Sequence, residues 1–360
     1  MNSRLLTLLF LSVATSARAG DPPPSDSKLA DIVTAPSTPS RWRIGAGYAQ
    51  LLGLKTEFTG LGNFRSAATA QPLGSGIDRD YDDGFVHLDS SGNLGGETWN
   101  WSYANATQYN SSGAGSMDFS ITNSLSNGHA EEDGGAKPGA EVFAYYDMGG
   151  AGFSVVKDRQ ASWGFRAGLQ YSRIDVSNND ILSTGLTKTT DTFDLNGTIP
   201  PLSPYTGSFG GPGPLLGDSP SRSTGVGGTG LVKGSRELDV HLALTNLGSY
   251  LEVPITEKFD VLLEAGVSFG VASGSYKFNS DTTASGLGSQ QSSGRESRTR
   301  FLPGLYLGLG ATYQINKDWA ILGSGRYQNM ESLDLGANGT EASLSFDSAF
   351  VVSLGVLYSF

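Results

Sequence analysis

The sequence predicts an all-β fold: a transmembrane, antiparallel, up-and-down β-barrel of about ten strands, with roughly 8 to 12 strands compatible with the pattern. Three observations predict it. Apolar side chains alternate with small or polar ones in many segments, short connections alternate with long ones, and the polar positions hold more Gly and Ser than Lys and Glu. Because successive side chains of a strand point to opposite faces, each segment has one apolar and one polar face.

The alternation with a period of two residues runs through most of the chain. Leu263 and Val267, for example, share one face, while Glu264 and Ser268 share the opposite one. Near Thr245 the phase slips by one residue, which predicts a β-bulge. The segments with this period are 41–51, 97–107, 114–123, 138–149, 161–177, 236–255, 259–277, 298–315, 318–332 and 344–360.

The connections between these segments differ in length. Because short and long connections alternate and the number of segments is even, we expect both chain ends at the end of the barrel that carries the short turns. Outer-membrane barrels have short periplasmic turns and long extracellular loops, so both termini are expected in the periplasm. The shorter connections are 108–113, 149–159, 256–258 and 316–317, and the longer ones are 52–96, 124–137, 178–235, 278–297 and 333–343.

The polar face distinguishes a barrel from a soluble β-sandwich, the other fold that such strands build. A sandwich exposes that face to water and typically covers it with charges, whereas here charges are few and Gly is frequent. Small residues suit the inside of a narrow barrel whose apolar face contacts lipid. The charges expected to point inward are Arg43, Asp118, Glu141, Asp147, Arg166, Asp239, Glu264 and Arg326.

Aromatic residues gather at the ends of the segments. Such positions are typical of the two aromatic girdles that a barrel places at the membrane interfaces. The aromatic residues are Trp42, Phe259, Trp319 and Phe360 on the side of the short turns, and Tyr171, Phe301 and Tyr327 nearer the long loops.

Composition and the N-terminus set further limits. Only 16% of the 360 residues are charged, against roughly a quarter in an average soluble domain, and the net charge of −11 argues against nucleic-acid binding. The absence of Cys excludes disulfides and thiolate metal sites. Arg4, a short apolar run and Ala17-Arg18-Ala19 predict a cleaved signal peptide over 1–19, because the run is too short for a membrane anchor. A Pro- and Ser-rich periplasmic linker over 20–40 then precedes the barrel domain, 41–360.

The end of the chain carries a resemblance to a known family. Val352, Leu354, Val356, Tyr358 and the terminal Phe360 alternate on one face. With the signal peptide and the amphipathic strands, this segment resembles the closing strand of bacterial outer-membrane β-barrel proteins. The resemblance implies an integral protein of the cell outer membrane, in contact with its lipid, and makes these five residues the signal that the barrel-assembly machinery recognises. It implies no particular activity.

Three functions stay open on the sequence alone. The first is a structural or surface-presenting barrel whose loops contact an extracellular ligand of unknown identity, with the inward charges paired as a plug. The second is a narrow passive pore for small solutes. The third, which we expect least, is a hydrolase at the rim that uses Asp239 and His241, so the chain is expected not to be an enzyme. The Pro- and Gly-rich loop 178–235 is expected to cap the barrel, fold inward or face a partner.

One acidic stretch resembles a calcium-binding loop. Asp78, Asp80 and Asp82 alternate, and Asp89 occupies the twelfth position counted from Asp78. In a calcium loop of this kind Gly occupies the sixth position and Glu the twelfth. Here Gly84 occupies the seventh position and Asp89 the twelfth. Calcium is therefore the single cofactor considered, and a solvated acidic turn is the simpler interpretation.

Overall fold

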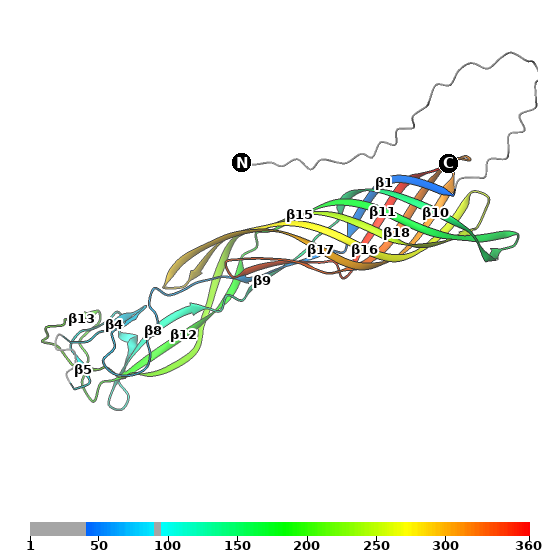
Figure 1. Cartoon of the computed structure of the whole chain (residues 1–360). Helices are drawn as coiled ribbons and strands as arrows, with labels where there is room; N and C mark the ends of the chain where they lie inside the picture. Colours follow the sequence, from blue (N-terminus) through cyan, green and yellow to red (C-terminus); the bar gives the residue numbers. More distant parts are fainter. Residues whose placement is uncertain (1–40, 90–94) are drawn as a thin grey trace, which may run out of the picture. The chain divides into compact units, whose positions relative to one another are not determined.

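The fold consists almost entirely of antiparallel β-strands. The computed structural model describes residues 41–89 and 95–360 (Figure 1). The expected signal peptide, 1–19, and linker, 20–40, lie outside the described residues. Within the described part of the chain, no helix has the length and apolar character needed to span a bilayer.

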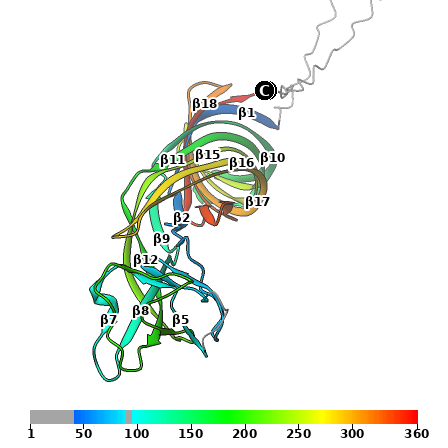
Figure 2. The same cartoon turned by 90° about the vertical axis from the view of Figure 1, so that its left-hand side faces the viewer.

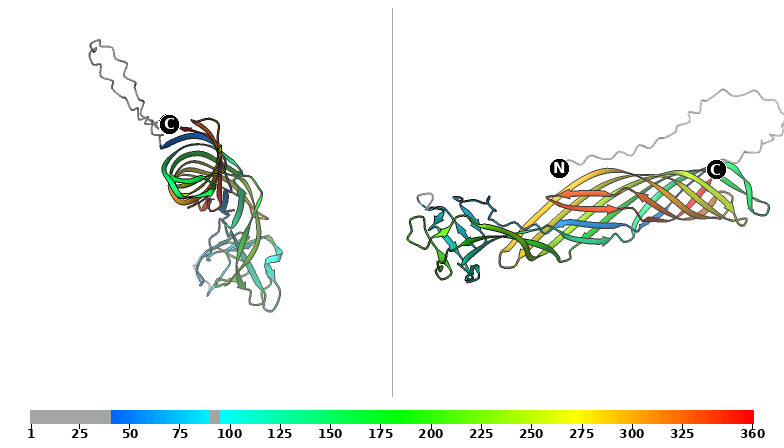
Figure 3. Two further views of the ribbon diagram at one scale, coloured as in Figure 1. Left: turned by 90° about the vertical axis from the view of Figure 1, so that its right-hand side faces the viewer. Right: turned by 90° about the horizontal axis from the view of Figure 1, so that it is seen from below.

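A closed ring of strands forms the barrel, as Figure 2 shows in end view and Figure 3 from the opposite side. Each strand pairs antiparallel with the next ring strand along the chain, and β21 closes the ring by pairing with β1. This confirms the predicted up-and-down barrel. Within residues 41–89 and 95–360 the ring has eight strands: β1 (Trp42–Leu52), β10 (Lys137–Val156), β11 (Arg159–Asn178), β15 (Ser221–Pro254), β16 (Phe259–Ala284), β17 (Gly288–Gln314), β18 (Trp319–Met330) and β21 (Ala349–Ser359).

The predicted strand count of about ten is corrected to eight, within the expected range. Segments 97–107 and 114–123 do not join the ring, because the strands that they form pair elsewhere. Strand β6 (Trp101–Tyr103) pairs with β4 (Gly84–Val86) and β13 (Tyr205–Thr206), and β8 (Ser116–Ser124) pairs with β12 (Leu182–Asp194) and β7 (Tyr109–Asn110). Most of the predicted loop 278–297 is instead the end of the β16–β17 hairpin, which turns only at residues 285–287.

The start of β1, the end of β21 and the short turns lie at one end of the barrel. Arg43 pairs with Ser359 there, and the turns at 157–158, 255–258 and 315–318 close the same end. We call the half of the barrel on this side the terminal half, and the other the distal half.

Two smaller assemblies arise from the connections at the distal end. One is a sheet with the order β19-β20-β2-β9, made of β2 (Lys55–Leu61), β9 (Gly128–Asp133), β19 (Leu333–Ala337) and β20 (Thr340–Ser345). The other, which we call the lobe, contains β3 (Arg79–Tyr81), β4 (Gly84–Val86), β5 (Glu97–Thr98), β6, the 3-10 helix η1 (Ala106–Gln108), β7 (Tyr109–Asn110), β8, β12 (Leu182–Asp194), β13 (Tyr205–Thr206), β14 (Leu216–Gly217) and the start of β15.

The polarity of the barrel strands inverts between the two halves. On β16, Leu263 and Val267 in the terminal half are exposed, whereas in the distal half Ser273 is exposed and Tyr276 and Phe278 are buried inside. The same side of the strand faces outward throughout, so only its chemistry changes. A barrel that leaves lipid and enters water requires this change.

The predicted bulge near Thr245 is a consequence of the same inversion and is corrected. Strand β15 pairs with β11 and β16 around this residue without a register shift. Leu244 faces the interior of the distal half and Leu247 faces outward in the terminal half. The apolar pattern therefore changes phase although the backbone does not.

Candidate functional site

The outer surface of the terminal half is an apolar belt. Its side chains are exposed because they have no protein to pack against, and such a contiguous apolar surface is what a barrel presents to lipid. The belt includes Ile44, Tyr48, Val142, Phe165, Leu169, Leu247, Leu263, Val267, Leu305, Leu307, Leu309, Tyr313, Ile321, Val352, Leu354 and Val356.

Aromatic residues border this belt. At the terminal end Trp42 lies beside Tyr146 with ring centroids 4.8 Å apart, and Trp319 lies beside Tyr358 at 4.9 Å. At the border of the belt with the distal half Tyr171, Phe301 and Tyr327 are exposed, as are Phe259 and Phe360 at the terminal end. These positions match the two predicted girdles.

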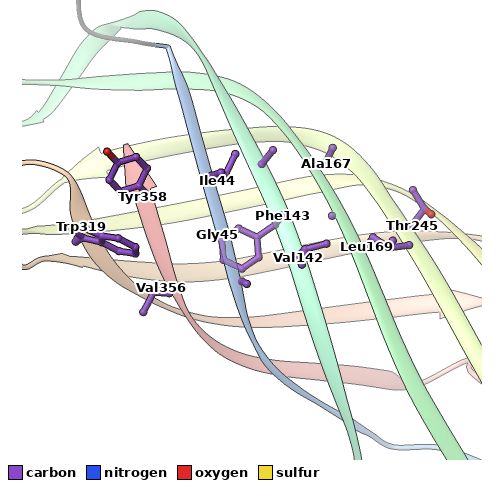
Figure 4. Close-up of a pocket in the computed structure, with 13 residues that line it drawn as sticks. Ile44, Gly45, Val142, Phe143, Ala167, Leu169, Thr245, Trp319, Val356 and Tyr358 are labelled. Atoms are coloured by element: carbon purple, nitrogen blue, oxygen red, sulfur yellow. The ribbon is translucent and has the colours of Figure 1, made fainter. Parts of the chain in front are cut away.

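A shallow groove of about 730 Å³ lies within the belt (Figure 4). It arises because Ala46, Ala144 and Ala167, on three adjacent strands, are smaller than their neighbours. Trp319 and Tyr358 stand at one end of the groove (Figure 4). Its apolar lining fits the hydrocarbon of lipid and adds no reactive group.

Paired charges fill the interior of the terminal half. Glu141 on β10 accepts hydrogen bonds from Arg166 on β11 and, at 2.8 Å, from Arg326 on β18. The side chains of all three are at most 1% exposed. The arrangement confirms the prediction that these residues point inward, and it matches an ion-paired plug.

Further pairs surround this centre. Glu264 accepts a hydrogen bond of 2.6 Å from the Tyr145 hydroxyl and lies 3.4 Å from Arg166 Nε. Arg43 makes two hydrogen bonds to Glu252, of 2.8 and 2.7 Å. Because each carboxylate meets a guanidinium, the buried charges compensate one another, as burial requires.

The interior of the distal half is apolar. Its buried side chains form one cluster, to which the β19-β20-β2-β9 sheet contributes Phe58, Leu335 and Leu344. The alternation does not predict this core, because it assigns the polar face to the interior along the whole strand length. The ring strands contribute Ala49, Leu51, Ile174, Val176, Leu238, Val240, Leu242, Leu244, Ala272, Tyr276, Phe278, Leu302, Met330, Ala349 and Val351.

Glycines on the inner face make room for large side chains, as predicted. A Cβ atom on Gly266 would collide with the Leu247 carbonyl oxygen and come within 2.8 Å of the Tyr306 ring, and one on Gly248 would come within 2.6 Å of the Tyr306 hydroxyl. On Gly168 it would lie 2.9 Å from Arg166 Nη1. The small residues are therefore a packing requirement of the plug.

Two of the charges predicted to face the interior, Asp239 and Asp118, lie elsewhere, whereas Asp147 keeps the inward side of β10 that it shares with Glu141 and Tyr145. Asp239 points outward from the distal half, because there the interior is apolar. Asp118 belongs to β8 in the lobe, where it accepts a hydrogen bond of 2.6 Å from Thr192. Asp147 lies near the terminal end and accepts one of 2.6 Å from the Gly149 backbone.

The candidate rim pair, Asp239 and His241, lies on the outer surface of the distal half, next to the aromatic border at Tyr171. His241 Nε2 is 3.7 Å from Asp239 Oδ1, and His241 Nδ1 is 2.7 Å from the Tyr171 hydroxyl. Asp239 is also held by Arg173 at 2.5 Å. Since Asp239 is engaged by Arg173, the arrangement is accounted for as a surface ion pair with an adjacent histidine.

The four candidate calcium ligands do not converge. Asp78 accepts a hydrogen bond of 2.6 Å from the Leu88 backbone, Asp80 lies 2.9 Å from His87, and Asp82 binds the backbone of Thr122 at 2.7 Å. Asp89 is buried. No group of three or more potential ligands suited to a metal occurs among residues 41–89 and 95–360. Calcium binding stays a prediction that this geometry does not support.

The lobe has an aromatic core of its own. Tyr81, Trp101, Phe119 and Phe193 are buried together, and the Phe119 and Phe193 rings meet edge to face at 5.5 Å. Much of the expected loop 178–235 is therefore folded, since β12, β13 and β14 all contribute to this lobe.

A buried carboxylate joins the lobe strands. Asp191 on β12 accepts hydrogen bonds of 2.6 and 2.7 Å from Arg222 on β15 and one of 2.8 Å from the Tyr81 hydroxyl. Burial, followed by the contact with Asp191, raises the pKa of Tyr81 well above its usual range. The Arg222 guanidinium is therefore held in an ion pair with Asp191.

Four residues of the predicted assembly signature share the outer face of β21, and the fifth, Phe360, follows directly after the strand. Val352, Leu354 and Val356 belong to the apolar belt, and Phe360 is 61% exposed. The Phe360 ring contacts Tyr358, with centroids 5.1 Å apart. The side chains are therefore accessible, while recognition by the assembly machinery stays a prediction.

Comparisons with known proteins give distant structural likenesses to outer-membrane β-barrels. No family model matches the chain, and no curated protein matches it. Similar solved structures include the attachment invasion locus protein Ail of Yersinia pestis in complex with sucrose octasulfate (10% identity, 89% of this chain and 97% of that chain covered, TM-score 0.28). They also include the outer membrane protease OmpT of Escherichia coli (10%, 90% and 98%, TM-score 0.32) and a Pseudomonas aeruginosa FadL homologue (8%, 88% and 90%, TM-score 0.19). These likenesses are too distant to carry an argument, and the fold rests on the strand pairing.

Proposed function

We propose that this protein is an integral outer-membrane β-barrel with a closed interior that presents its lobe at the cell surface for contact with other molecules. The short turns and both chain ends then lie in the periplasm, and the distal half and lobe lie outside the cell. The proposal includes no catalytic role and no cofactor.

The observation that carries the proposal is the inversion of polarity along the barrel. The terminal half is apolar outside and polar inside, as lipid requires, whereas the distal half is apolar inside and polar outside, as water requires. The distal core and the Glu141 charge cluster follow each other along one interior. Both are tightly packed, which favours a closed barrel over a solute path.

The folded lobe supports the presenting role. A loop that only joins two strands has no need of a buried aromatic core, whereas a surface held for binding must be kept in shape. At least ten buried side chains, among them Trp101 and Phe119, pack together in the lobe and hold its shape.

Planar-bilayer recording tests the closed barrel. We expect the refolded protein to insert without discrete conductance steps. The matched variant combines Glu141→Ala, Arg166→Ala and Arg326→Ala in the charge cluster with Leu242→Ala and Leu302→Ala in the distal core. These changes remove side chains from both parts of the interior, so we expect conductance steps from the folded variant. Regular steps from the unaltered protein would support the narrow pore and overturn the proposal.

The outer-membrane location has a separate test. A barrel in lipid or detergent migrates differently on a gel before and after boiling, because the closed ring resists detergent until it is heated. We expect this heat-dependent shift, together with recovery of the protein in the outer-membrane fraction. A mature chain that stays dissolved without detergent would contradict the proposal.

A further inference from the structure

One edge of the lobe sheet has no neighbouring strand. Strand β15 pairs with β16 only from Leu231 onward, where Leu231 lies opposite Thr283. Its first residues, Ser221–Val226, pair with β12 on one side. In the described part of the chain no strand pairs with their other side.

The register shows which backbone groups point to this free edge. On β8 the Ser120 N–H donates to Asp83 Oδ1 and the Ser120 carbonyl accepts from the Asp82 N–H, so Ser120 points away from β12. Its partner Thr190 must then point towards β15, where it faces Ser223. Because N–H and C=O directions alternate along a strand, those of Arg222, Thr224 and Val226 point to the free edge.

The opposite edge of the same sheet is covered. The Ser120 N–H donates to Asp83 at 2.9 Å and the Thr122 N–H donates to Asp82 at 2.7 Å, so carboxylates take the place of a further strand. The Ser124 N–H donates to the Phe64 carbonyl at 2.9 Å. The chain thus satisfies the β8 edge and leaves the β15 edge open.

The free edge lacks the features that normally prevent strand addition. Proteins protect exposed edges with Lys, Pro or inward charges, whereas Ser221–Val226 carries one charge, Arg222, and Asp191 holds that charge. The Val226 side chain is 91% exposed. A bulge follows only at Gly227, after six regularly paired residues.

We propose that this edge docks an extended segment of a partner polypeptide, which adds to the sheet as an antiparallel strand beside β15. Three N–H donors and three carbonyl acceptors, from Arg222, Thr224 and Val226, supply its hydrogen bonds. Since Arg222 is paired with Asp191 and the other side chains of this edge are small and uncharged, recognition rests on the backbone and tolerates many side chains in the partner. The inference deepens the proposed presenting role, because it names the kind of molecule that the lobe contacts.

The test uses the full-length refolded protein in detergent and a labelled peptide of about ten alternating Thr and Val residues with Lys at each end. We expect saturable binding, with slower amide hydrogen exchange at Arg222, Thr224 and Val226. Thr224→Pro removes the central donor without touching the β12 ladder, and we expect it to weaken binding about tenfold or more. Thr224→Ala keeps the N–H and should bind as the unaltered protein does.

A second control does not depend on the folding of any variant. The same peptide with every backbone nitrogen methylated has no backbone N–H donors and should not bind. Failure of the unmodified peptide to bind, equal binding by Thr224→Pro, or protection at other amides would overturn the inference. Self-association of the protein that Thr224→Pro abolishes, with no peptide binding, would assign the edge to a second copy and overturn it too. Conductance plays no part here, so this inference and the closed barrel can fail separately.

Discussion

Arg326 donates a hydrogen bond of 2.8 Å to Glu141 across the barrel interior, from β18 to β10, although β1 and β21 separate these strands in the ring. The same carboxylate accepts from Arg166. The contact therefore joins two strands that are not neighbours in the ring. Two of its three members are cations, so the carboxylate is the group on which the others depend.

Replacing Glu141 by Ala should destabilise the barrel strongly. The change leaves two buried guanidinium groups without their shared partner, and breaking a buried charge pair from one side costs about 3–5 kcal/mol. The free energy of unfolding in urea, measured in lipid vesicles, checks this. Glu257→Ala is the control, because its side chain is 91% exposed and lies 4.0 Å from Arg159, and it should change the free energy by less than about 1 kcal/mol. Equal effects would contradict a structural role for Glu141.

The polarity inversion gives a second prediction, made on one strand. Leu263→Arg places a charge in the apolar belt of β16 and should cost about 2–4 kcal/mol if that residue lies near the bilayer midplane. Ser273→Arg, also outward but in the distal half, should be nearly neutral. Unfolding from vesicles measures both variants. An equal cost for Ser273→Arg and Leu263→Arg would show that the apolar belt does not end between these two residues.

The interior glycines give a third prediction. Gly266→Ala forces a Cβ atom against the Leu247 carbonyl and the Tyr306 ring, so it should destabilise the barrel by about 1–3 kcal/mol, as overpacking does. Gly323→Ala meets no atom within 4 Å of its Cβ and serves as the control. The midpoint of thermal unfolding, followed by heat-dependent gel migration, should fall for the first variant only.

The fourth prediction concerns pH and the lobe. Burial raises the pKa of Asp83, although the hydrogen bonds from Ser120 oppose the shift. Since the carboxyl holds its proton more tightly in the folded lobe than in the unfolded chain, its stabilising contribution is present below the unfolded pKa. That contribution is lost as pH rises through the folded pKa. Asp83→Asn should remove this dependence, so the protection factors of lobe amides, which correct for the intrinsic effect of pH on exchange, should vary less between mildly acidic and neutral pH. An unchanged dependence would show that another group is responsible.

Sequence alone could predict the barrel because lipid imposes a simple rule on each strand. Where strands sit in a bilayer, as over Val352–Phe360, one face must be apolar, and the alternation is visible. The inward positions of Glu141, Arg166, Glu264 and Arg326 followed from it. The rule changes at the membrane boundary, and the change near Thr245 looked like a bulge because alternation cannot tell which face is outside.

The lobe could not be predicted for a different reason. Its strands β3, β4 and β6 have three residues each, too short for a period of two to be visible. Its core joins residues far apart in the chain, such as Tyr81 and Phe193. The free edge of β15 depends on which strands pair with one another, and a single segment of sequence does not show this. The predicted inward position of Asp239 is wrong because the polar face of the strands lines the interior only in the terminal half.

The last prediction separates assembly from stability. Phe360 is exposed and its ring contacts Tyr358 alone among the ring pairs of the described residues, so Phe360→Ala should change the free energy of unfolding by less than about 1 kcal/mol. If the terminal residue serves as an assembly signal, the amount of folded protein in the outer membrane of a Gram-negative host should nevertheless fall severalfold. Phe259→Ala, another exposed aromatic change at the same end, should leave that amount nearly unchanged. A similar decrease for both variants would point to the aromatic girdle rather than to a signal.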